Sequence, residues 1–109
     1  MNLFIQEAAE QDILHQVEWY AEKGLPAVGL RFRDAVLNAI DALAAMPGAG
    51  PPKFINDPRL SGLRSWPVED FDEFRVYYLA RPELLIVVRV LHGKRDIGAL
   101  LEGQELDER

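Results

Sequence analysis

The sequence predicts a single α+β domain in which a pair of helices packs on one face of a mostly antiparallel sheet. Apolar residues recur at helical spacing through the first 46 residues, whereas they alternate with a period of two after about residue 60. The stretch "PGAGPP" at 47–52 separates the two halves, because its prolines and glycines end any helix. We therefore expect the order β-α-α-β-β-β with a short C-terminal helical turn, as one domain over residues 1–109.

The first half predicts a short strand at 2–5 followed by an antiparallel helical hairpin. A helix over 7–23 is indicated by an apolar stripe, and Gly24 then fits the position after a helix end. Pro26 fits the start of the next helix, which runs to about residue 46. The two stripes are Ala9, Ile13, Val17 and Tyr20, then Val28, Phe32, Val36, Ile40 and Leu43. The short connection makes the two helices antiparallel neighbours.

The second half predicts three strands. The first, at 60–68, is weakened by Gly62 and by Pro67, which favours an edge position. The strands at 74–81 and 84–92 form an antiparallel hairpin. After Asp96, "DIGALLEG" indicates a helical turn, and from about residue 103 we expect a flexible tail.

Strict alternation assigns the faces of the last two strands. We expect the helices to cover the set Phe74, Val76, Tyr78, Leu84, Ile86, Val88 and Val90. The other face then presents Arg75, Tyr77, Leu79, Leu85, Val87, Arg89 and Leu91, with only the C-terminal tail available to cover it. An uncovered apolar face with arginines indicates a partner surface. The alternative is that the tail folds back over it.

The charge is unevenly distributed. The chain carries −6, with three basic and seven acidic residues in 1–46, eight and six in 53–95, and one and five in 96–109. The acidic ends argue against general affinity for nucleic acid, which depends on neutralising phosphates. Cysteine is absent, and we find no metal-ligand spacing, cofactor motif or run long enough to span a membrane. The N-terminus has no secretory signal pattern, so we expect a cytoplasmic protein without metal or cofactor.

The end of the last strand, "VRVLHGKRD", carries the candidate chemistry. His92 could act as a general acid or base in phosphodiester cleavage, with Arg89 or Arg95 stabilising the phosphate, or it could be a surface or capping residue. Arg64, Arg75, Arg89 and Arg95 could gather at one end of the sheet and bind phosphates or acidic partner residues. Alternatively, they could form internal ion pairs with the carboxylates Glu69, Asp70, Asp72 and Glu73.

Four stretches carry a resemblance to a known family. They are "AAEQDILHQVEWYAEKG", "AVGLRFRDAVLNAIDALAAMPGAG", "LRSWPVEDFDEFRVYYL" and "IVVRVLHGKRD". With them the chain resembles the RelE/ParE superfamily, the toxin halves of bacterial toxin–antitoxin modules, and in its last stretch the plasmid-stabilisation branch of ParE. The resemblance implies the fold predicted above. It also implies growth arrest, neutralised by a ParD-like ribbon-helix-helix antitoxin whose C-terminal segment wraps the toxin and which alone contacts operator DNA.

ParE-like toxins inhibit DNA gyrase, whereas RelE-like toxins cleave mRNA on the ribosome. The sequence departs from the RelE pattern because it is acidic, offers only Lys53, Arg59 and Arg64 in the central region, and has no tyrosine after the last strand. We therefore expect a gyrase inhibitor and assign no catalytic residue. If the alternative holds and the chain is an endoribonuclease, the catalytic residues would be His92, Arg89 and Arg95. We expect antitoxin contacts from Arg75, Tyr77, Leu85, Val87, Arg89 and Leu91, and target contacts from Arg64, His92, Lys94 and Arg95.

Overall fold

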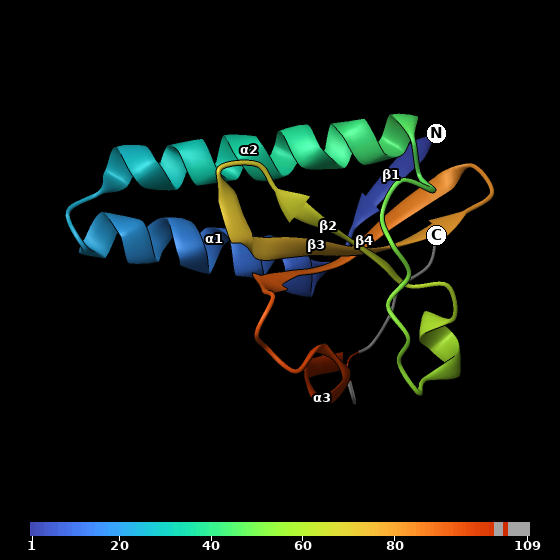
Figure 1. Cartoon of the computed structure of the whole chain (residues 1–109). Coiled ribbons are helices and arrows are strands. Elements are labelled where there is room, and N and C mark those ends of the chain that lie inside the picture. The colour runs from blue at the N-terminus through green and yellow to red at the C-terminus, as the bar shows by residue number, and fades with distance from the viewer. Residues whose placement is uncertain (102–103, 105–109) are drawn as a thin grey trace.

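The computed structural model describes residues 1–101 and 104, and it forms a four-stranded sheet with two long helices on one face (Figure 1). The elements are β1 (Asn2–Ile5), α1 (Glu7–Glu22), α2 (Pro26–Ala45), the 3₁₀ turn η1 (Pro58–Leu60), β2 (Arg64–Val68), β3 (Phe71–Arg81), β4 (Leu84–His92) and α3 (Ile97–Leu101). The strand order is β1-β4-β3-β2. Only β1 runs parallel to its neighbour, so the predicted α+β fold with a mostly antiparallel sheet is confirmed.

The helical hairpin forms where the sequence predicts it. Gly24 adopts a φ of +77°, which a residue without Cβ does at little cost, and Pro26 begins α2. The two helices approach closely at Gly29, where an added Cβ would lie 3.0 Å from the Val17 carbonyl oxygen. The α2 stripe packs on the sheet, and Phe32 makes edge contacts with the rings of Phe71 and Phe74.

The start of β2 is later than predicted, because residues 58–60 form η1 instead of strand. Pro58 occupies the first position of this turn, and the Asp57 side chain accepts a hydrogen bond from the Arg59 amide. β3 in turn begins at Phe71, three residues earlier than predicted, because the connection from β2 is a tight turn at 69–70.

The predicted faces of β4 are wrong over its first half. Tyr77 of β3 pairs with Arg89, but the next residue, Tyr78, pairs with Val87, so Val88 is an extra residue in a β-bulge. The bulge inverts the alternation on its N-terminal side. Consequently Leu85 and Val87 lie under the helices, whereas Leu84, Ile86 and Val88 belong to the opposite face. Val90 and Leu91, beyond the bulge, lie on the faces predicted for them.

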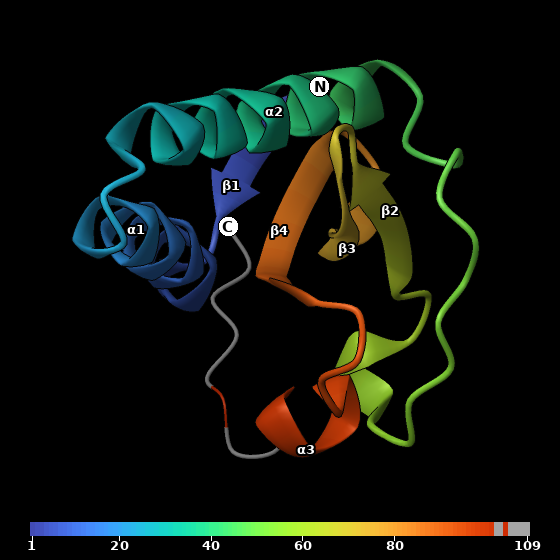
Figure 2. The ribbon, with the colours of Figure 1, turned by 60° about the vertical axis from the view of Figure 1, so that its left-hand side comes forward.

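The second face of the sheet is covered, so the prediction of an open face is wrong. The alternative of a folded-back C-terminal tail is confirmed only in so far as α3 takes part, because the loop before β2 supplies the rest of the cover. Leu60 and Leu63 from the loop and Ile97 and Leu101 from α3 are all buried against this face. Figure 2 shows α1 and α2 on one side of the sheet and α3 on the other. The flexible tail predicted from about residue 103 lies largely outside the described residues.

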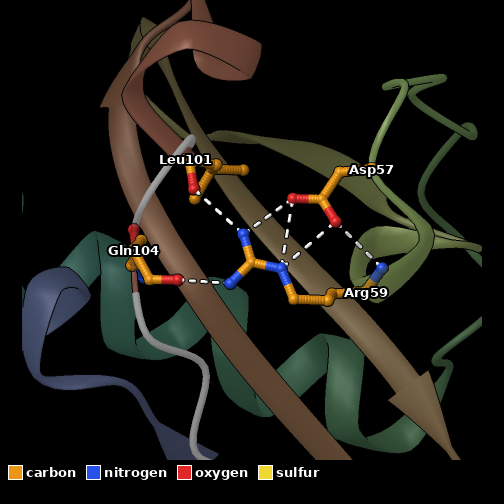
Figure 3. A network of polar contacts seen from close by, with 4 residues as sticks. All are labelled: Asp57, Arg59, Leu101 and Gln104. Carbon is orange, nitrogen blue, oxygen red and sulfur yellow. Dashed lines mark hydrogen bonds and ion pairs between the residues drawn. The ribbon is translucent and has the colours of Figure 1, made fainter.

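Arg59 ties α3 to the loop (Figure 3). Its guanidinium donates to the Asp57 carboxylate, with the shortest N–O distance 2.7 Å, and to the carbonyl oxygens of Leu101 and Gln104 at 3.3 and 2.5 Å. The hydrogen bonds from Arg59 lower the pKa of Asp57, and the same pairing raises the pKa of Arg59. We call these contacts of Arg59 with Asp57, Leu101 and Gln104 the clasp. The clasp places a positive charge at the C-terminal end of α3, which the helix dipole favours.

Among the described helices, none combines the length and the apolar character that a membrane crossing requires.

Candidate functional site

The end of the sheet where β4 stops gathers five polar side chains, which we call the polar end: Glu73, Arg75, His92, Lys94 and Arg95. The Gly93 amide donates to the Glu73 carbonyl oxygen at 2.6 Å, which holds the chain against β3 as it leaves the sheet. A Cβ at Gly93 would lie 3.5 Å from that oxygen and from Arg75 Cδ. Lys94 and Arg95 are exposed beyond this point. Asp96 follows and caps α3, since its Oδ1 accepts the Ala99 amide at 3.1 Å.

Both ring nitrogens of His92 have partners. Nδ1 accepts the Lys94 amide hydrogen at 3.2 Å, so a neutral ring carries its proton on Nε2. Nε2 lies 3.1 Å from Glu73 Oε2, to which it donates, and the ring packs edge-on against Phe74. To accept a proton from a substrate, the imidazole would first have to release one of these bonds. The other histidine, His15, is exposed on α1.

Arg89 meets a carboxylate from its own chain. Its Nε and Nη2 donate to the two carboxylate oxygens of Asp12 in α1 at 2.7 and 2.8 Å, and Asp12 Oδ2 also accepts the Val90 amide at 3.0 Å. The side chains are only 15% and 12% exposed. The hydrogen bond to Asp12 raises the pKa of Arg89. Sequence reasoning missed Asp12, although it stands three residues after the buried Ala9 and therefore on the inner flank of α1.

The four arginines do not gather at one end of the sheet, which corrects that prediction. Arg64 lies opposite Tyr78, whereas the polar end begins where His92 lies opposite Phe74. Four residues of β3, or about 13 Å along the strand, therefore separate Arg64 from the polar end. Arg64 donates to the carbonyl oxygens of Gly48 and Gly50 at 3.3 and 2.6 Å. Arg75, at the polar end, donates to Ser65 Oγ at 3.0 Å.

The internal ion pairs considered between these arginines and the turn carboxylates are not formed either. Arg64, Arg75 and Arg89 bind the groups named above, and Glu73 binds His92. Within the described part of the chain, the side chains of Glu69, Asp70 and Asp72 make no hydrogen bond or ion pair.

The side chains predicted to contact an antitoxin are mostly buried. Tyr77, Leu85, Val87 and Leu91 are between 0 and 5% exposed. Burial also raises the pKa of Tyr77. The premise that these residues form an open face is therefore wrong, because of the bulge and the covering segments. Arg75 and Arg89 of this set are half-buried.

The described residues contain no group of three or more histidines, aspartates or glutamates placed to hold a metal ion.

The fold resembles that of a known toxin–antitoxin complex component. A chain in a solved structure described as the chromosomal ParDE TA system from P. aeruginosa superposes with a TM-score of 0.69 at 20% sequence identity, over 84% of this chain and 95% of that chain. At this identity the likeness shows the fold. A search of curated proteins found no match.

The family is shown by the sequence itself. Residues 3–97 match the family model described as "ParE toxin of type II toxin-antitoxin system, parDE". The chain therefore belongs to the ParE toxin family, and the resemblance noted from its sequence is confirmed.

Proposed function

We propose that this chain is the toxin of a cytoplasmic type II module, that a ParD-like antitoxin neutralises it, and that it arrests growth by inhibiting DNA gyrase. Membership of the ParE family supports the toxin role. The proposal includes a ribbon-helix-helix antitoxin that wraps the toxin with its C-terminal segment and contacts operator DNA on behalf of the complex.

The distribution of free cations is the observation that favours gyrase over ribosome-bound mRNA. A ribonuclease has to approach a dense polyanion. Two of the four arginines considered for phosphate binding, Arg64 and Arg89, are engaged inside the fold, and the chain as a whole carries −6. The exposed cations Lys94 and Arg95, beside His92, suit a local protein contact. We propose Lys94, Arg95 and His92 as target contacts. The fourth predicted target contact, Arg64, stays a prediction, because it does not lie with these three at the polar end.

The ribonuclease alternative is supported by the Glu73–His92 pair. A carboxylate beside an imidazole can share the transfer of a proton, and Lys94 and Arg95 stand next to the pair. If this chemistry operates, removing the imidazole should cost about 10²–10⁴-fold in rate.

Purified wild-type chain, added separately to a gyrase supercoiling assay and to a cell-free translation assay, distinguishes the two functions. We expect inhibition of supercoiling, intact mRNA, and DNA-damage signalling on expression in cells. His92→Gln should keep most of the growth arrest, because an inhibitor needs contacts and not proton transfer. Lys94→Ala/Arg95→Ala should weaken inhibition about tenfold, whereas the matched control Lys23→Ala/Lys53→Ala should not. Codon-specific mRNA cleavage by the wild type, lost in His92→Gln, would establish the ribonuclease instead.

A further inference from the structure

A groove of about 600 Å³ runs between α2 and the edge strand β2, on the helix side of the sheet. Its floor is apolar. Ala35, Ala39 and Ala42 share one face of α2, because they are four and three residues apart, and the half-buried ring of Trp66 lies across from them. The small alanine side chains leave the space that the groove occupies.

The rim of the groove is acidic. Asp34 lines it from α2, and Glu69, Asp70 and Asp72 line it from the turn between β2 and β3, against the single cation Arg31. The carboxylates of the turn have no hydrogen-bond or ion-pair partner among the residues that the structure describes. Asp34 pairs with Arg33 at 3.2 Å, so the free carboxylates lie on the turn side of the apolar floor. They match an amphipathic segment that carries lysine or arginine beside its apolar side chains.

The position of the groove favours the antitoxin over other occupants. Val68 pairs with Phe71 across the turn, and Phe74 pairs with His92, so the groove and the polar end lie at the same end of the sheet. A segment seated in the groove therefore stands beside the cations that we propose for the target. Nucleic acid is disfavoured, because the rim would repel its phosphates.

We propose that the groove between α2 and β2 is a docking site for a basic amphipathic segment of the cognate antitoxin. This inference rests on the proposed pairing with an antitoxin and adds the site and the chemistry of the contact. The rim charges steer the segment into place, and the floor buries its apolar side chains. The binding is therefore salt-dependent, since rim charges are screened.

The test measures the affinity of the full chain for its cognate ParD-like antitoxin at about 0.05 and 0.3 M salt. The rim variant Glu69→Gln/Asp70→Asn/Asp72→Asn removes three charges and keeps the turn, because asparagine tolerates the φ of +67° found at Asp70. We expect affinity about tenfold weaker at low salt and a smaller difference at high salt. The control Glu18→Gln/Glu22→Gln/Asp41→Asn removes three exposed charges from the helices and should leave the affinity unchanged.

A second pair of variants tests the floor. Ala42 is exposed and lines the groove, so Ala42→Phe fills it without burying anything in the core, and it should weaken binding about tenfold. Ala21→Phe places the same ring on an exposed position of α1 and should have no effect. Circular dichroism confirms that each variant is folded.

The possible results distinguish a failure of the docking site from a failure of the proposed pairing with an antitoxin. Binding of the wild type with no loss in the rim or floor variants overturns the docking site and leaves the antitoxin pairing intact. Loss of gyrase inhibition in these variants, with antitoxin binding unchanged, assigns the groove to the target and also overturns the proposal. No binding of the antitoxin by the wild type contradicts the proposed pairing itself.

Discussion

The ion pair between Asp12 and Arg89 is expected to be the most consequential single interaction in the fold. It joins α1 to β4 across 77 residues of sequence, and it also satisfies the Val90 amide at a strand edge. Replacing Asp12 with alanine leaves Arg89, whose side chain is 15% exposed in the intact fold, without its counter-charge, and it leaves one backbone donor without an acceptor.

The cost can be estimated from these two losses. Breaking a buried pair costs about 3–5 kcal/mol, and the partial exposure of Arg89 lowers this to ~2–3 kcal/mol. The unpaired amide adds ~1 kcal/mol. A total of ~3–4 kcal/mol lowers the Tm of a domain of this size by roughly 12–32 °C.

Urea unfolding followed by tryptophan fluorescence measures the effect. Asp12→Ala and Arg89→Ala should each be strongly destabilised. Asp12→Leu/Arg89→Met should recover most of the stability, because two apolar groups can replace a buried pair at little cost. A loss of under ~0.5 kcal/mol in Asp12→Ala, or a double variant as unstable as the sum of its single changes, would refute the reasoning.

Two further interactions give testable changes. Tyr78→Phe removes the hydroxyl that accepts the Gly50 amide at 2.9 Å and donates to the loop after α2, so unfolding by urea should show a loss of ~1–3 kcal/mol. Arg59→Ala should release α3, measured as faster hydrogen exchange of the Leu100 amide. In the wild type, the same clasp should weaken in acid. The pKa of Asp57 is lowered in the folded chain, so the stability that its ionised carboxylate contributes is present above about pH 4 and is lost as the pH falls further.

The helical hairpin was predictable because local signals mark it completely. The stripes of α1 and α2 have one period throughout, and Gly24 and Pro26 mark the turn in a form that needs no tertiary information. The antiparallel hairpin of β3 and β4 was equally local, since Pro82 and Glu83 separate an alternating run from an apolar run.

The face assignments failed because a β-bulge has no signal in an unbroken apolar run. Each of Leu85, Ile86, Val87 and Val88 suits either face, so one extra residue inverts the alternation without placing a polar side chain in the core. The cover of the second face was missed for a different reason. Residues 58–63 have no period to read, and the burial of Leu60 and Leu63 among them depends on packing with α3, which Arg59 holds in place.

The partner of Arg89 shows why a candidate site cannot be read from a strand alone. An arginine in an apolar strand requires an anion, and the sequence offers 18 carboxylates. Most of them are closer to Arg89 along the sequence than Asp12 is. Only the packing of α1 on β4 selects Asp12, and that choice changes Arg89 from an expected partner contact into a determinant of stability.

These internal contacts reduce the surface that remains available for a partner of this toxin. The second face is closed by η1 and α3, and Arg64 and Arg89 are held within the fold. The polar end, with Lys94 and Arg95, and the groove beside it are adjacent surfaces of opposite charge. A protein that binds the acidic groove can block the cationic end by its bulk, without matching the contacts that the target makes there. With the antitoxin docked in the groove and the target on the polar end, as we propose, the two contacts require different chemistry on neighbouring residues, and variants of the groove and of the polar end should separate them.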